Sequence, residues 1–186
     1  HIIFAECGGL AKLSGVMGSV IDTDRGIFAA GDVSRLYRRP SSFSPHTRLV
    51  VTEQTSNLGG GAVWPLDQIQ AVSRTAADLG LSVHMDGARV LNAAVATGIS
   101  VSDYASMHDS AWLAFTKGLG CPVGAVLTGS RDFIREAWHF KRMFGGAMRQ
   151  TGVLTGMCLY ALDHHVERLF EDHARAKRIE AFLSGS

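Results

Sequence analysis

Short apolar runs alternate along the chain with amphipathic stretches of helical period, and this alternation restricts the fold more than any other feature. The clearest helical stretch covers residues 66–79, because Pro65 stands at its first turn and Gly80 follows its end. Strands that alternate with helices favour an α/β fold with a mainly parallel sheet sandwiched by helices. The other predicted elements are strands at 2–5, 48–52, 81–85, 111–115 and 125–128, and helices at 132–143, 153–161 and 166–183.

The composition is that of an ordinary globular protein. Hydrophobic residues make up 46% of the 186 residues, charged residues make up 19%, and the net charge is +1. A chain with this balance is not expected to bind nucleic acid or a membrane surface. No run of about 18 apolar residues is present, so no membrane span is expected either. The three cysteines are far apart and form no CxxC pair, which argues against a disulfide framework and favours a reducing cytoplasm.

Polar and ionisable residues follow three of the predicted strands. Ligands of parallel α/β sheets bind at the carboxyl ends of the strands, so these residues are the first candidates for a site. Each position alone is weak support for a site, but their occurrence at three strand ends is stronger. They are Glu53 and Ser56 after the strand at 48–52, Asp86 and Arg89 after the strand at 81–85, and Lys117 after the strand at 111–115.

Lys117 is the most informative of these residues. A lysine that directly follows an apolar strand and is flanked by small residues is expected to lie close to the core. A buried lysine tends to lose its charge, and a neutral amine is what Schiff-base chemistry requires. The local pattern also fits a surface lysine in a glycine-rich turn, so both interpretations stay open here.

The other ionisable candidates also have two interpretations each. Asp86 can cap a helix that starts at 89 or 90, or it can pair with the pyridinium nitrogen of a cofactor, and both can hold. Arg89 and Arg149 are either solvent-facing residues or forks that bind a carboxylate. The late histidines lack the acidic or cysteine partner that would complete a metal site, so no metal is predicted.

Several segments together resemble the low-specificity L-threonine aldolases, which are fold-type I pyridoxal-phosphate (PLP) enzymes of the aspartate aminotransferase superfamily. The similarity runs over nearly the whole chain. Its most specific parts are the lysine segment with its Pro-Val-Gly tail and the Gly-Gly-x-Met-Arg-Gln segment. The segments that carry the resemblance are His1 with 6–9, and then 53–57, 84–89, 116–124 and 145–150.

The resemblance implies a role for each matching residue. Lys117 would hold PLP as a Schiff base, Asp86 would pair with the pyridine nitrogen, and His1 would stack on the cofactor ring. Arg89 would lie near the cofactor and the substrate carboxylate, and Arg149 would bind substrate or support the site. The implied activity is cleavage of L-threonine or L-allo-threonine to glycine and an aldehyde.

The same resemblance implies how the protein is organised. Residues 1–150 would form the central part of the PLP-binding large domain. Residues 151–186 would form a helical segment that leads toward a small C-terminal domain. The family's phosphate-binding loop is expected before His1 and the small domain after Ser186, so this chain is expected to hold most of the catalytic core. The implied protein is a cytoplasmic homo-oligomer, a dimer or a tetramer.

One position departs from the family pattern. Many members have a histidine in a Glu-Asn-Thr-His-Asn segment, where this chain has Ser56. A serine hydroxyl is a poor general base at neutral pH without help, so Ser56 leaves the substrate and the reaction type open. The alternatives are a PLP-dependent amino-acid racemase or β-eliminating lyase on the same scaffold, and a non-catalytic binding or assembly domain with a decayed site.

Overall fold

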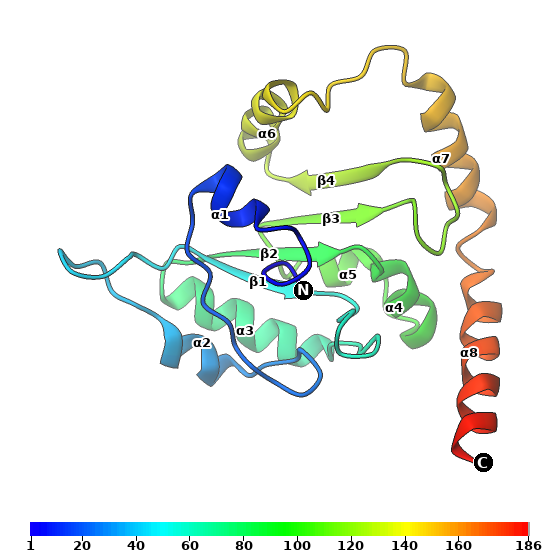
Figure 1. Ribbon diagram of the computed structural model, residues 1–186, viewed down its shortest axis with the longest axis horizontal. Coiled ribbons are helices and arrows are strands. Elements are labelled where there is room, and N and C mark those ends of the chain that lie inside the picture. Colours follow the sequence, from blue (N-terminus) through cyan, green and yellow to red (C-terminus); the bar gives the residue numbers. More distant parts are fainter. Residues whose placement is uncertain (186) are drawn as a thin grey trace.

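The computed structural model describes residues 1–185, and its centre is a four-stranded sheet (Figure 1). The first three strands run parallel to one another, and the fourth runs antiparallel to the third. The predicted mainly parallel sheet with flanking helices is confirmed, together with four of the five predicted strands. The strands lie in the order β1 (Leu49–Glu53), β2 (Ser82–Gly87), β3 (Ser110–Ala114) and β4 (Ala125–Gly129).

The predicted strand at 2–5 is wrong, because this segment folds as a turn. The backbone carbonyl of His1 accepts hydrogen bonds from the N–H groups of Phe4 (3.1 Å) and Ala5 (2.9 Å). These local bonds satisfy backbone groups that a sheet ladder would otherwise have to pair. The turn also fixes the position of His1, which matters for the site described below.

Eight helices accompany the sheet in residues 1–185. The predicted helices at 66–79, 132–143, 153–161 and 166–183 are confirmed as α3, α6, α7 and α8, and a helix start at 89 or 90 is confirmed as α4. Three further helices were not predicted, because their five to seven residues are too few to show a helical period. The helices are α1 (Gly9–Ser14), α2 (Ala30–Leu36), α3 (Leu66–Asp78), α4 (Val90–Thr97), α5 (Val101–Ala105), α6 (Arg131–Met143), α7 (Gly152–His164) and α8 (Leu169–Ser184).

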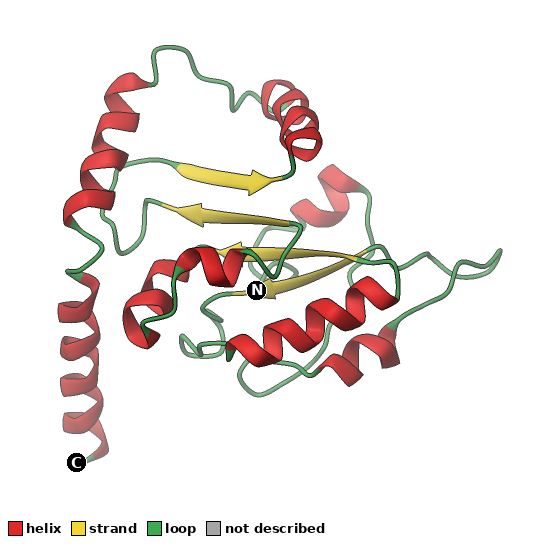
Figure 2. Cartoon of the chain, turned by 180° about the vertical axis from the view of Figure 1, so that it is seen from behind, coloured by secondary structure: helices red, strands yellow, loops and turns green. Residues whose placement is uncertain are grey.

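Helices α3, α4 and α5 cover one face of the sheet, and α1 lies on the opposite face (Figure 2). The main core forms between the sheet and the first of these layers. Its largest fully buried side chains include Trp64, Tyr104, Ile69 and Met85. No helix within residues 1–185 is long and apolar enough to cross a membrane.

The alternation of β2 assigns its side chains to the two faces. Val83 and Met85 are buried in the core against α3, whereas His84 and Asp86 are half-buried on the other face. The hydrophobic pattern of this strand therefore fixes the side of the sheet on which Asp86 lies.

Truncation of Ile69 tests the packing of α3 on the sheet. Ile69 is 1% exposed, so Ile69→Ala is expected to lower the free energy of unfolding by about 2–5 kcal/mol through lost burial and a residual cavity. Urea unfolding followed by circular dichroism measures this change. Arg74→Ala, on the exposed face of the same helix, is the control and should stay within about 0.5 kcal/mol of the parent protein. An equal loss in both variants would contradict the assigned core.

A second, smaller cluster lies beyond the end of β3. It joins the segment after β3 to α7, through Phe115, Leu119, Cys121 and Ala161. The turn between them closes with a hydrogen bond from the N–H of Gly120 to the carbonyl of Lys117 (2.9 Å), and Gly120 has a φ of 71° that favours glycine. This cluster holds the turn that carries Lys117, here called the lysine turn (residues 116–120).

Candidate active site

Three side chains lie next to one another at the carboxyl ends of the parallel strands. In the sheet register Glu53 of β1 pairs with Asp86 of β2, and Asp86 pairs with Trp112 of β3. Residues paired in register project to the same face of a sheet, so two carboxylates and an indole ring are neighbours there. Glu53 follows a predicted strand, but no sequence motif assigns it a role. Only the strand register shows that it lies beside Asp86.

His1 completes this group from the N-terminal turn. Its Nδ1 lies 3.5 Å from Oε1 of Glu53 and 3.9 Å from Oε1 of Glu6. One potential ligand atom each of His1, Glu53 and Asp86 lies within 4.8 Å of the other two. No hydrogen bond reaches the buried Nδ1 atom of His1 from the described residues. Histidine, glutamate and aspartate side chains can all bind metal ions. The earlier expectation that the protein has no metal site therefore stays a prediction.

Burial disfavours the charged form of both carboxylates. It raises the pKa of Glu53, although a hydrogen bond from the N–H of Asn57 (3.2 Å) opposes this shift. Burial likewise raises the pKa of Asp86, and the N–H of Ala88 (3.1 Å) and the charge of Lys117 oppose it. Two carboxyl groups with raised pKa values at the end of a sheet are typical of a functional site, because a bound cation or proton donor relieves their burial.

Neutralising Glu53 tests this electrostatic penalty. Because the pKa of Glu53 is raised in the folded state, the folded protein binds more protons than the unfolded chain between its ordinary and its raised pKa. Stability therefore falls as pH rises through that window, and the penalty is fully present above it. Glu53→Gln is expected to raise the melting temperature slightly at neutral pH and to leave it nearly unchanged at about pH 3.

Differential scanning calorimetry at both pH values measures this difference. Glu136→Gln neutralises an exposed carboxylate of α6 and serves as the control. A lower melting temperature of Glu53→Gln at neutral pH would contradict the assigned penalty.

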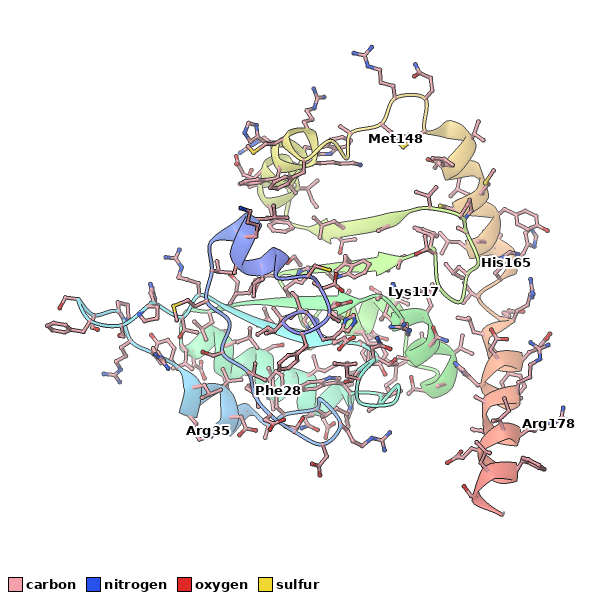
Figure 3. All side chains as sticks on the ribbon, in the orientation of Figure 1. Phe28, Arg35, Lys117, Met148, His165 and Arg178 are labelled. Atoms are coloured by element: carbon pink, nitrogen blue, oxygen red, sulfur yellow. The ribbon has the colours of Figure 1, made fainter. Side chains whose placement is uncertain are left out.

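Lys117 is exposed, which agrees with the interpretation of a surface lysine in a glycine-rich turn and not with the expectation that it lies close to the core. The chain turns directly after Phe115, so the lysine side chain leaves the sheet at its end instead of entering the core (Figure 3). Its Nζ atom lies 5.7 Å from the centre of the Trp112 ring, and its charge acts on Asp86. The structure thus brings Lys117, Asp86 and His1 to the same end of the sheet.

The remaining predicted residues differ in how close they lie to this group. Arg89 is half-buried at the start of α4, where its N–H donates to the carbonyl of Gln54 (3.3 Å) and its charge weakly opposes the rise that burial causes in the pKa of Glu53. Arg149 is exposed in the loop between α6 and α7, and it has no hydrogen-bond or ion-pair partner within the described chain. The structure therefore brings Arg89 to the group and leaves Arg149 outside it.

Ser56 is buried beside His1, Glu53 and Asp86, and the backbones of two glycine residues pack closely against its side chain. A Cβ atom added to Gly26 would overlap the Ser56 Oγ atom, and one added to Gly59 would lie 2.7 Å from it. The backbones of both glycine segments therefore lie close to the Ser56 side chain and leave little space beside it. The serine that departs from the family pattern is thus matched to its local backbone.

A cavity of about 870 Å³ runs along β1, between the sheet and the N-terminal segment. His1, Glu53, Ser56 and Asp86 are among its lining residues, together with residues 15–21. Lys117 is not among its lining residues. The carboxylates and His1 therefore face this cavity, whereas Lys117 lies outside it.

The family of the chain follows from comparison with known proteins. A family model described as Beta-eliminating lyase matches residues 1–185. The chain belongs to the beta-eliminating lyase family. Among curated relatives, this family member is 36% identical to a low-specificity L-threonine aldolase of Candida albicans over 98% of its own length and 49% of the relative. It is 35% identical to the low specificity L-threonine aldolase of Escherichia coli K12, over 95% of its own length and 52% of the relative.

The fold of this beta-eliminating lyase family member also matches a solved structure. A threonine aldolase of Leishmania major superposes with a TM-score of 0.78 at 21% identity, covering 100% of this chain and 54% of that one. At this identity the match establishes the shared fold. The chain spans about half the length of the curated relatives it matches. The resemblance that the sequence motifs indicated is confirmed at the level of the family.

Proposed function

We propose that the protein is a PLP-dependent lyase that cleaves L-threonine, L-allo-threonine or a related β-hydroxy-α-amino acid to glycine and an aldehyde. The observation that carries this proposal is the meeting of Lys117, Asp86 and His1 at the carboxyl end of the sheet. The relatives named above, which are L-threonine aldolases, support the same assignment.

The chemistry of these residues fits the cofactor. The half-buried Asp86 has a raised pKa, and a protonated pyridine nitrogen is a partner that would stabilise its carboxylate. The amine of Lys117 is exposed, so an aldehyde can reach it. The Nδ1 atom of His1 lies 3.5 Å from Glu53 but makes no hydrogen bond within the described residues, so no hydrogen bond would have to break for the ring to reorient.

The proposed mechanism assigns a task to each of these groups. PLP supplies, when bound, an electron sink for the pair of electrons released as the Cα–Cβ bond breaks. Asp86 would keep the proton on the pyridine nitrogen, and Lys117 would hold the cofactor covalently between turnovers. Arg89 would bind the substrate carboxylate through its planar fork.

The proton of the substrate's β-hydroxyl must also be accepted by some group. The Ser56 hydroxyl is a poor base at neutral pH. His1 and Glu53 are the better acceptors at the site, since an imidazole and a carboxylate both take up protons near neutral or acidic pH.

From the resemblance to the low-specificity L-threonine aldolases we also propose a cytoplasmic homo-oligomer, with residues 1–150 in the PLP-binding domain and 151–186 in the segment that follows it. Arg149 would act at substrate or at a subunit interface in that assembly.

Product analysis tests the proposed reaction. Purified protein is incubated with PLP and L-threonine, and acetaldehyde and glycine are quantified together. Equal amounts of the two products are expected. A keto acid with ammonia would instead establish β-elimination, which the family description favours as a second candidate. Formation of D-allo-threonine, in which only Cα is inverted, would establish a racemase, and failure of a full-length version to bind PLP would favour a non-catalytic binding domain.

A further inference from the structure

Two cysteines that are 37 positions apart in sequence meet at the base of the lysine turn. Cys121 directly follows the turn, and Cys158 lies in α7. The thiol of Cys121 donates to the carbonyl of Met157 (3.7 Å), the residue before Cys158. The thiol of Cys158 donates to the carbonyl of Val123 (3.7 Å), two residues after Cys121. Each thiol therefore lies against the backbone next to the other cysteine.

The surroundings of the two thiols differ. Cys121 is 7% exposed within the second core cluster, and Cys158 packs against that cluster while staying half-exposed. Both are free thiols, and the Cys158 sulfur also lies 3.0 Å from the position that a Cβ atom of Gly124 would take. Burial and the neighbouring Cys158 thiol raise the pKa of Cys121, so Cys121 is the less reactive partner at neutral pH.

A non-covalent contact already joins the same two segments. The Nδ1 atom of His165, at the end of α7, donates to the carbonyl of Leu119 in the lysine turn (2.7 Å). Lys117 and His165 are labelled in Figure 3 on these two neighbouring segments. A covalent link between Cys121 and Cys158 would therefore reinforce an existing contact and would not require a new docking of α7.

We propose that Cys121 and Cys158 are a reversible disulfide site that ties the lysine turn to α7. The oxidant is a small-molecule disulfide. The thiolate of Cys158 attacks one of its sulfurs, so a mixed disulfide forms and one small thiolate leaves. Cys121 then loses its proton to solvent and attacks the Cys158 sulfur, which releases the second small thiol. Two protein thiols are oxidised, and one small disulfide is reduced to two thiols.

In the oxidised protein, the disulfide would restrain the motion of the lysine turn. Residues 117–121 form one short connection, so a bond at Cys121 restricts the backbone four residues from Lys117. The inference does not rest on the proposed reaction, because it concerns thiols and the mobility of a turn. It holds equally for an aldolase, a β-eliminating lyase or a non-catalytic domain.

Peptide mapping after mild oxidation tests the site. The protein is treated with oxidised glutathione at about pH 8, where more thiol is ionised, alkylated, and digested with trypsin without reduction. Mass spectrometry is expected to find peptide 118–131 joined to peptide 150–168, and reduction should separate them. Cys158→Ser should lose the joined peptide. Cys7→Ser is the matched control, since Cys7 is exposed and lies outside both segments, and it should keep the joined peptide.

Two results would overturn the proposal. One is stable glutathione on Cys158 while Cys121 stays alkylatable, because the second exchange step would then fail. The other comes from hydrogen exchange of the amides in 116–124, which is expected to be slower in the joined form. Unchanged exchange in a protein that carries the joined peptide would show that the link does not restrain the turn.

Discussion

Replacement of Lys117 by alanine is expected to abolish covalent attachment of PLP and to lower aldehyde release from threonine by about a thousandfold or more. The reason is that Lys117 supplies the primary amine beside Asp86 and Trp112. The other lysines of the chain are Lys12 in α1, Lys141 in α6 and Lys177 in α8. Within the described residues, only the Lys117 amine contacts the Trp112 ring and acts on the pKa of Asp86.

Borohydride reduction measures the first part of this result. Treatment of the protein with PLP and then borohydride should leave a pyridoxyl group on Lys117, and peptide mapping locates it. Lys141→Ala is a matched control, because Lys141 also lies over an indole ring, 4.6 Å from the centre of Trp138. It should keep both the label and the activity. A pyridoxyl label that persists in Lys117→Ala, on any other residue, would contradict the assigned anchor.

Asp86→Asn is expected to lower aldehyde release by about 10²–10⁴-fold while the protein stays folded. An amide cannot stabilise a proton on a pyridine nitrogen, so the electron sink would be weakened. The same change removes a carboxylate whose pKa is raised by burial, and the melting temperature without cofactor should therefore not fall at neutral pH. Activity is thus expected to fall while the melting temperature does not. A variant that misfolds would instead lose both.

Parallel assays of turnover and thermal unfolding measure this separation. Asp78→Asn changes an exposed carboxylate at the end of α3 and should alter neither quantity. Near-parent turnover of Asp86→Asn would exclude the proposed role of Asp86 at the pyridine nitrogen. A large fall in its melting temperature would instead mean that Asp86 is mainly a structural residue at the start of α4.

The sequence predicted the architecture well because the fold depends on periodic apolar patterns. The strands β1 to β4 and the helix α3 follow directly from such patterns. The apolar run Ile2-Ile3 has the composition of a strand, but local hydrogen bonds to His1 formed a turn instead. Periodicity reports which side chains can be buried, and it does not report which backbone groups find partners.

Contacts between distant segments account for what the sequence could not provide. Glu53 is recognisable as a strand-end residue, but its place beside Asp86 depends on the register of two strands 33 positions apart. The meeting of Cys121 with Cys158 depends on the docking of α7. Lys117 was expected near the core because an apolar strand precedes it, yet the turn after Phe115 directs its side chain outward. The local sequence pattern identifies candidate site residues, but only the tertiary packing determines which of them are neighbours.

The pleat of β2 also limits how this protein can change in evolution. Met85 and Asp86 are adjacent in sequence but lie on opposite faces, one against α3 and one at the sheet end. Inserting or deleting a single residue earlier in this strand would exchange them, placing a carboxylate in the core and a thioether at the site. A length change in β2 would therefore disrupt stability and chemistry in one step.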